Sequence, residues 1–248
     1  MSLNEVLPFV SSVIMLVFTV SVMQRWFLTR KAHFLFWGIG LAMFGASSFA
    51  EAYFALGRWS APVFFIWYLF GAVLNAAWIG HGSLLLLVRK RWVHALTALL
   101  IVGSLAASAL MVQTILKTNG SAYVGGIALS EQYRNLMPAI RNGGLVRLTT
   151  PFFNIYGLLT LVGGALWSAW LFMRKQVLPN RVVGNVLIAA GALTIALAST
   201  LTRLGVGAYL YLGELVAAGL MYGGFLMAAR PATAAEAKAE GARAVRAV

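Results

Sequence analysis

The sequence contains no cysteine and no aspartate, and its only acidic residues are six glutamates. Without cysteine, a disulfide framework, a thiolate nucleophile and a Cys-based metal site are excluded. Without aspartate, intramembrane aspartyl hydrolysis and metal-hydrolase schemes that need aspartate ligands are excluded as well. We therefore expect a protein that is not an enzyme and that carries no cofactor or metal.

Charged residues make up only 10% of the chain, whereas 61% of it is hydrophobic. The hydrophobic residues form seven stretches, each close to the ~20 apolar residues that cross a hydrocarbon core. Backbone groups in lipid must be satisfied within the segment, and these runs do not alternate as barrel strands do, so each is expected to be a helix. The sequence therefore predicts an all-α bundle of seven transmembrane helices, over residues 6–24, 34–56, 61–88, 93–116, 150–173, 182–202 and 207–228.

The 19 basic residues are distributed unevenly between the two sides of these stretches. Thirteen follow the first, third, fifth and seventh stretches, and the other six lie on the opposite side. By the positive-inside rule, the N-terminus is expected outside and the C-terminus inside. The basic residues that give the net charge of +13 then lie mainly at cytoplasmic helix ends, beside anionic lipid headgroups. Nucleic-acid binding is therefore not expected.

Little of the chain lies outside the stretches. We expect a bundle over residues 1–230 with an external loop at 117–150, followed by a short Ala-rich cytoplasmic tail at 231–248. The N-terminus lacks the basic region and A-x-A site of a cleaved signal peptide, so the first stretch is expected to be retained. In the loop, Ser130 is expected to cap a short helix running toward Ile140. We expect this helix to lie passively on the membrane; the alternative is a lid over an outward-facing cavity.

The chain also contains a weak internal repeat. The first and fifth stretches both begin with Pro-Phe and end in Arg-Lys. The third and seventh carry tyrosine, glycine and arginine at identical intervals, as Tyr68, Gly82 and Arg89 and as Tyr209, Gly223 and Arg230. This predicts three helices, a linking fourth and three more, with both triplets in the same orientation.

This 3+1+3 plan across residues 6–228 resembles in topology the SWEET and PQ-loop transporters, in which parallel repeats flank a midplane site. The chain departs from those families because it lacks their Pro-Gln pair: Pro8 and Pro151 are each followed by phenylalanine. Segments 51–87 and 151–226 also resemble uncharacterised seven-helix proteins of bacterial inner membranes. The first resemblance implies small-molecule transport, and the second implies a multi-pass protein of the bacterial cytoplasmic membrane.

Ionisable side chains inside a bilayer are costly and are candidates for function wherever they occur. Glu51 precedes Arg58 by seven residues, which places it about 10 Å below the outer helix end. Glu214 lies at nearly the same depth in the seventh helix. We predict an outward-facing pocket for ligand binding or proton coupling between helices two, three, six and seven, formed by Glu51, Glu214, Arg203, Tyr68, Tyr211 and, as its floor, Asn75. The structural alternative pairs Glu214 with Arg203 and Glu51 with Arg58 or a tyrosine, which would simply lock helix ends together.

His81 stands between two glycines, about 12 Å from the cytoplasmic end of the third helix. We expect it to hydrogen-bond across helices, with a proton relay as the alternative. His33 and His94 lie at helix ends rather than opposite His81, so a bis-histidine haem is not expected. Every lysine lies outside the seven stretches, which excludes a retinal Schiff base.

A transporter or small-ligand permease is the function that this pattern favours. Sparse polar content and broad apolar faces also suit a structural or accessory subunit of a larger membrane complex. A sensor that signals through a separate partner is the third alternative. The expected partners are the lipid bilayer and either a small-molecule ligand or other membrane subunits.

Overall fold

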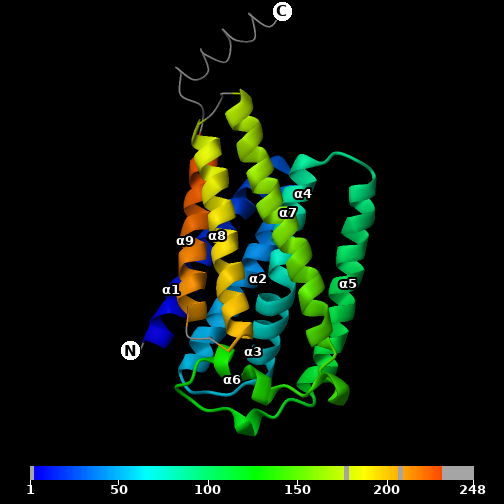
Figure 1. Cartoon of the computed structure of the whole chain (residues 1–248), viewed down its shortest axis with the longest axis vertical. Helices are drawn as coiled ribbons and strands as arrows, with labels where there is room; N and C mark the ends of the chain where they lie inside the picture. Colours follow the sequence, from blue (N-terminus) through cyan, green and yellow to red (C-terminus); the bar gives the residue numbers. More distant parts are fainter. Residues whose placement is uncertain (1–2, 176–178, 206–208, 231–248) are drawn as a thin grey trace, which may run out of the picture.

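The computed structural model describes residues 3–175, 179–205 and 209–230 (Figure 1). In this part of the chain, seven spans are long and apolar enough to cross a membrane, so the chain is a multi-pass integral membrane protein. The spans are α1 (Leu3–Thr29), α2 (Ala32–Ala55), a third span composed of α3 (Ala61–Ile66), η1 (Trp67–Leu74) and α4 (Asn75–Leu87), then α5 (Trp92–Ile115), α7 (Val146–Lys175), α8 (Pro179–Arg203) and α9 (Leu210–Ala228).

The seven predicted stretches are confirmed as helices, with ends that differ by a few residues. α1 continues to Thr29, where the left-handed backbone of Arg30 (φ 54°) turns the chain into α2. α7 begins somewhat before its predicted stretch, at Val146, and α9 begins somewhat later, at Leu210. Apolar runs mark the part of a helix that suits lipid, whereas backbone hydrogen bonding sets the ends of the helix itself.

Six spans form a closed ring, and α5 packs on its outside. Around the ring, α1 contacts α2, α2 contacts the third span, and the third span contacts α7; α7 then contacts α8, α8 contacts α9, and α9 returns to α1. Among the described spans, α5 packs closely against the third span and α7, and Figure 1 shows it at the edge of the bundle. The triplets α1–α4 and α7–α9 therefore occupy equivalent positions, which is the packing order that a 3+1+3 repeat requires.

Glycines allow the helices of the ring to approach closely. A Cβ at Gly157 of α7 would lie 2.3 Å from the carbonyl carbon of Ala76 in α4. Likewise, a Cβ at Gly184 of α8 would lie 2.6 Å from the carbonyl oxygen of Gly224 in α9. Small residues at such crossings let backbones pack directly in membranes, where apolar burial supplies little attraction between helices.

The third span is interrupted by a wider turn, because η1 is a π-helix between two α-helical segments. Such turns are frequent at functional sites. Gly71 lets α2 approach this turn, since a Cβ there would lie 1.9 Å from the Ser47 hydroxyl. Two carbonyl groups of η1 accept side-chain hydrogen bonds, that of Trp67 from Ser47 (3.3 Å) and that of Ala72 from Asn154 (3.0 Å). The irregular turn is thus fixed by polar contacts to α2 and α7.

The end of the bundle that carries the external loop is called the loop end, and the opposite one the tail end. The loop contains α6 (Leu129–Leu136), which begins one residue before the predicted Ser130 and has no side-chain cap. It stops at Leu136 rather than at Ile140, because the next residue precedes Pro138 and a residue before proline disfavours helical backbone.

The external loop packs onto the bundle as a lid, so the predicted passive position on the membrane is wrong. Leu129 and Leu136 are each only 1% exposed. The Leu129 amide donates to the Tyr211 hydroxyl of α9 (3.1 Å), and the Tyr123 hydroxyl donates to the Phe54 carbonyl of α2. Burial raises the pKa of Tyr123, which keeps its hydroxyl protonated as a donor. Figure 1 shows the loop running across the whole loop end.

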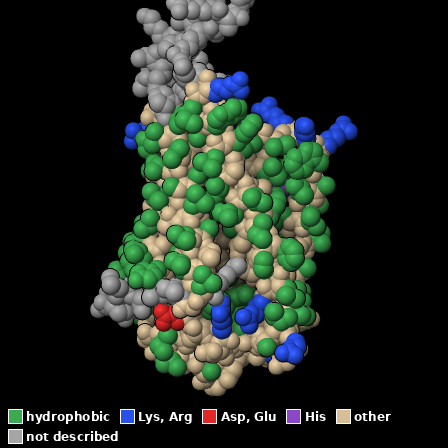
Figure 2. Space-filling view, in the orientation of Figure 1, with side chains coloured by type: hydrophobic (Ala, Val, Ile, Leu, Met, Phe, Trp, Pro, Cys, Tyr) green, Lys and Arg blue, Asp and Glu red, His purple; other side chains and the backbone are tan. Residues whose placement is uncertain are grey.

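Charged and apolar side chains are segregated along the bundle. Figure 2 shows Lys and Arg side chains at both ends and hydrophobic side chains over the surface between them. The predicted tail, residues 231–248, lies outside the described residues. Nothing in the packing assigns an inner and an outer side, so the N-out orientation stays a prediction.

Candidate functional site

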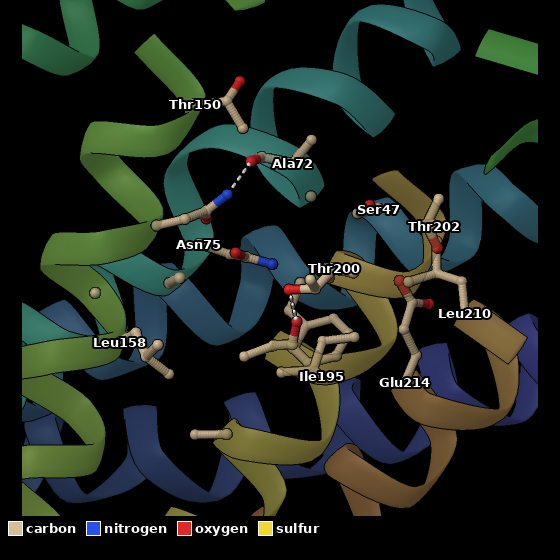
Figure 3. A pocket seen from close by; sticks show the side chains of 18 of the residues that line it. Ser47, Ala72, Asn75, Thr150, Leu158, Ile195, Thr200, Thr202, Leu210 and Glu214 are labelled. Carbon is tan, nitrogen blue, oxygen red and sulfur yellow. Dashed lines mark hydrogen bonds between the residues drawn. The ribbon is translucent and has the colours of Figure 1, made fainter. Parts of the chain in front are cut away.

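A cavity of about 310 Å³ lies inside the ring, below the lid (Figure 3). This volume is at the lower end of the roughly 300–1,000 Å³ that is usual for small-molecule sites. Its walls come from α2, η1, α4, α7, α8 and α9, and α6 closes it at the loop end. Most of the lining is apolar, but it includes the polar side chains of Ser47, Glu51, Asn75, Thr150, Asn154, Thr200 and Glu214.

Two buried carboxyl groups meet at this cavity. Glu51 of α2 is 1% exposed and Glu214 of α9 is 7% exposed, and the two side chains lie within hydrogen-bonding reach of each other. Oε1 of Glu51 accepts from the Trp67 indole (2.7 Å), and Oε2 of Glu214 accepts from the Ser48 hydroxyl (3.3 Å). In the described part of the chain, Oε2 of Glu51 has no hydrogen-bond donor. Two carboxylates this close repel each other unless a proton or a cation lies between them.

Three aromatic rings line the cavity that holds this carboxyl pair. Trp67 and Tyr68 belong to η1, and Tyr133 belongs to the lid helix α6. The ring centroid of Tyr133 lies 5.7 Å from that of Trp67 and 6.2 Å from that of Tyr68. The lid therefore contributes a side chain to the site. Because Tyr133 packs against Trp67, a movement of the lid would also affect the indole that donates to Glu51.

Amide groups occupy the cavity further from the lid. Asn75 stands where η1 joins α4, and Figure 3 shows its amide directed toward Thr200 of α8. The Asn154 amide is held by the Ala72 carbonyl (3.0 Å), which fixes α7 against the π-helical turn. Polar groups thus extend from the carboxyl pair toward the middle of the bundle.

The structure brings most of the predicted site residues together. Four of them line the cavity: Glu51, Tyr68, Asn75 and Glu214. Tyr211 is buried at 3% exposure, but its hydroxyl binds the lid backbone instead of facing the cavity. Arg203 is the last residue of α8, and its side chain lies outside the described residues.

Two details of the predicted pocket require correction. The walls were expected from helices two, three, six and seven, but the fifth span, α7, and the lid helix α6 contribute as well. The alternative pairing of Glu51 with Arg58 is also wrong, because Arg58 is exposed beyond the end of α2 and Glu51 accepts from Trp67.

Trp67 and Ser48 are the functional contacts that the sequence reasoning missed. A signal for Trp67 exists: Glu51 lies one turn before the end of α2, and Trp67 lies just after α3, so adjacent antiparallel helices place them at similar depth. Ser48 lies three residues before Glu51, on the same helical face.

His81 lies in a separate polar cluster nearer the tail end. It is fully buried, its Nδ1 lies 2.6 Å from the Tyr156 hydroxyl of α7, and its Nε2 lies 2.8 Å from the Thr97 hydroxyl of α5. The predicted hydrogen bonding across helices is confirmed. His81 is not on the cavity wall, and its bonds tie the outer helix α5 to the ring.

Within the described residues, no group of three or more His and Glu side chains is placed to hold a metal ion. No protein-family model, curated protein or solved structure matches the chain. Its function must therefore be argued from the cavity and the chemistry of its walls.

Proposed function

We propose that this membrane protein is a transporter that binds a small ligand in the cavity below the lid. The observation that carries the proposal is the buried carboxyl pair of Glu51 and Glu214. The two residues come from opposite halves of the chain, so movement of one triplet of helices against the other would change their contact directly. Buried carboxyl groups facing a cavity are typical of proton-coupled pathways through membranes.

A shared proton gives this pair two states. When the cavity holds no cation, one proton between Glu51 and Glu214 removes the repulsion between the carboxylates. When the proton leaves, the pair needs a bound cation or must separate. Coupling of this kind requires that the two states favour different arrangements of the helices, since a ligand shifts only those equilibria whose states it binds differently.

An accessory subunit is the alternative, supported by the outer position of α5 and its exposed apolar residues, such as Leu99 and Leu105 (66% and 67% exposed). Membrane-exposed apolar residues are expected in either case, however. A carboxyl pair at the wall of a cavity is costly in lipid, and ionisable groups kept in a membrane at that cost are candidates for function. The cavity therefore favours transport.

The transport proposal can be tested before any substrate is known. The chain has no native cysteine, so a single Ser199→Cys variant places one thiol at the cavity wall on α8. We expect a membrane-impermeant thiol reagent, added outside, to label this thiol both in right-side-out vesicles and in inside-out vesicles. Ser104→Cys, buried on α5 away from the cavity, is the matched control and should stay unlabelled.

Glu214→Gln, which keeps the shape of the side chain and removes its charge, should bias this labelling toward one side. Labelling of Ser199→Cys from one side only, at both acidic and alkaline pH, would contradict alternating access. It would leave a binding protein or a sensor in place of a transporter.

We further propose that the protein lies in a bacterial cytoplasmic membrane with its loop end outside. The orientation rests on the basic residues, most of which lie at the tail end of the spans or in the tail. The bacterial membrane rests on the resemblance of segments 51–87 and 151–226 to seven-helix proteins of bacterial inner membranes. A reporter fused after Val248 should behave as cytoplasmic, and one inserted within residues 117–150 as periplasmic. The opposite pair of results would invert the orientation and the side from which the lid is reached.

A further inference from the structure

Apart from the proton proposed to lie between the two glutamates, one acceptor of the carboxyl pair has no partner in the protein. Oε2 of Glu51 is buried at the cavity wall and receives no hydrogen bond in the described part of the chain. A buried acceptor without a donor is costly, and a carboxylate favours charged N–H donors over neutral ones. The group that completes this site in the loaded protein is therefore expected to bring N–H and positive charge.

The aromatic rings beside the pair point to the same chemistry. Trp67, whose indole donates to Glu51, lines the cavity together with Tyr68 and Tyr133, and the ring centroids lie about 6 Å apart (5.7, 6.0 and 6.2 Å). The faces of such rings attract ammonium groups, and the attraction is strongest where water is excluded. Carboxylates alone would also suit a metal ion, but the aromatic rings favour an organic cation.

The cavity also extends to the side of the bundle. Its lining includes Ile155 of α7, which is 58% exposed, and Thr200 of α8, which is exposed as well. Figure 2 shows a hollow in the lower half of this face, with hydrophobic side chains on its flanks and Lys or Arg side chains at its loop end. This surface belongs to the spanning part of both helices and would therefore face lipid tails. A ligand using this route must be soluble in the membrane.

From these three observations we infer that the ligand is a lipophilic primary or secondary amine, which reaches the Glu51–Glu214 pair from the membrane through the gap between α7 and α8. The inference names the substrate class of the transporter proposed above and rests on that proposal for its physiological meaning. The ammonium group lies between the carboxylates, and the apolar part of the amine occupies the apolar wall of the cavity.

Binding exchanges one cation for another. The empty pair shares one proton and therefore carries one negative charge. When the protonated amine enters, the shared proton leaves to water. The two carboxylates and the bound ammonium group together again carry one negative charge. No covalent bond changes. Among the described residues, the phenols of Tyr68 on η1 and Tyr133 on α6 line the same cavity, and the phenol of Tyr211 on α9 interacts with the pair. Arg203 ends α8 with its side chain outside the described residues.

The test uses the full chain in lipid nanodiscs and three probes of one shape: 4-phenylbutylamine, 4-phenylbutan-1-ol and 4-phenylbutyrate. Titration calorimetry in two buffers of different protonation enthalpy gives both affinity and proton release. We expect the amine to bind roughly tenfold or more tightly than the alcohol or the carboxylate, with about one proton released per amine.

Glutamine variants separate the site from the rest of the protein. E51Q and E214Q should each weaken amine binding roughly tenfold or more and abolish proton release. E131Q is the matched control, because Glu131 is an exposed glutamate on α6. E131Q should bind the amine and release the proton like the wild type.

The lateral route has its own pair of variants. Ile155→Trp places a bulky ring at the gap, whereas Leu159→Trp places the same ring one turn away on the exposed side of α7 (68% exposed), off the cavity wall. We expect Ile155→Trp to slow association of the amine by roughly tenfold and Leu159→Trp to leave it unchanged. Equal rates for the two variants would overturn the lateral route.

Tighter binding of the alcohol or the carboxylate, still lost in E51Q, would overturn the amine class. Amine binding without proton release would overturn the exchange. Each of these results leaves the transport proposal standing, because that depends on the two-sided labelling of Ser199→Cys. Conversely, amine binding with one-sided labelling would sustain the ligand class and refute transport.

Discussion

The shared proton makes a sharp prediction about two substitutions of the same residue. Glu51→Gln replaces the protonated carboxyl by a group of the same shape, whose oxygen can accept from Trp67 and whose N–H can donate to Glu214. Glu51→Leu has similar bulk but neither accepts nor donates. If the empty site holds a proton and not a cation, glutamine should be tolerated and leucine should not.

The contacts of Glu51 set the size of the difference. Leucine leaves the buried Trp67 indole without its acceptor at 2.7 Å, and an unsatisfied buried donor costs about 1–3 kcal/mol. It also removes the contact with Glu214, which in a membrane interior is worth about 0.6–1.7 kcal/mol. We expect Glu51→Leu to lower the free energy of unfolding by about 2–4 kcal/mol and Glu51→Gln by less than about 1 kcal/mol.

Unfolding in SDS, followed by circular dichroism in mixed micelles, measures both free energies on the same scale. Glu131→Leu, at an exposed position on α6, reports the cost of the substitution away from the cavity and should be close to neutral. Should Glu51→Gln prove as damaging as Glu51→Leu, Glu51 must carry a negative charge paired with a cation. The reasoning that places a proton between the glutamates would then be refuted.

Three further substitutions test the packing around the site. Gly157→Ala should cost about 1–3 kcal/mol in the same SDS assay because its Cβ meets backbone at 2.3 Å, whereas Gly163→Ala, with no atom within 4 Å, should stabilise α7 by about 0.5–1 kcal/mol. His81→Ala should cost about 1–3 kcal/mol through its two lost hydrogen bonds, and proteolysis should show that α5 is released first. Tyr211→Phe should cost about 0.5–1.5 kcal/mol and speed hydrogen exchange at the Leu129 amide, because the lid loses its acceptor on α9.

The spanning helices were predictable because hydrophobicity and length record the membrane directly in the sequence. Depth along each helix could be read in the same way, which is why Glu51 and Glu214 were expected at one level and are found there. Asn75 was predicted as the floor by the same argument. Equal depth does not determine whether a side chain faces lipid or the bundle interior. The cost of a charge in lipid predicted an inward orientation for both glutamates, and both are buried in the bundle.

What the sequence could not reveal are contacts that depend on the lateral order of the helices. The participation of α7 in the cavity wall follows from the closed ring, and no local pattern encodes that ring. Trp67 looked like one of many aromatic residues, since only its position opposite Glu51 distinguishes it. The loop was expected to lie on lipid as an amphipathic segment, because the apolar residues of such a segment suit a membrane surface as well as a protein surface. The local sequence does not indicate that Leu129 and Leu136 are inserted into the bundle.

The two hydrogen bonds of the carboxyl pair differ in when they can form during synthesis. Trp67 is 16 residues after Glu51, so their bond is available as soon as the third span emerges. Glu214 is 166 residues after its partner Ser48, a delay of about 10–30 s at ribosomal speed. During that interval Glu51 lies in the membrane without Glu214, and the Trp67 indole is available as its hydrogen-bond donor. A Trp67 variant should therefore impair insertion and early survival of the chain more than it weakens the finished protein.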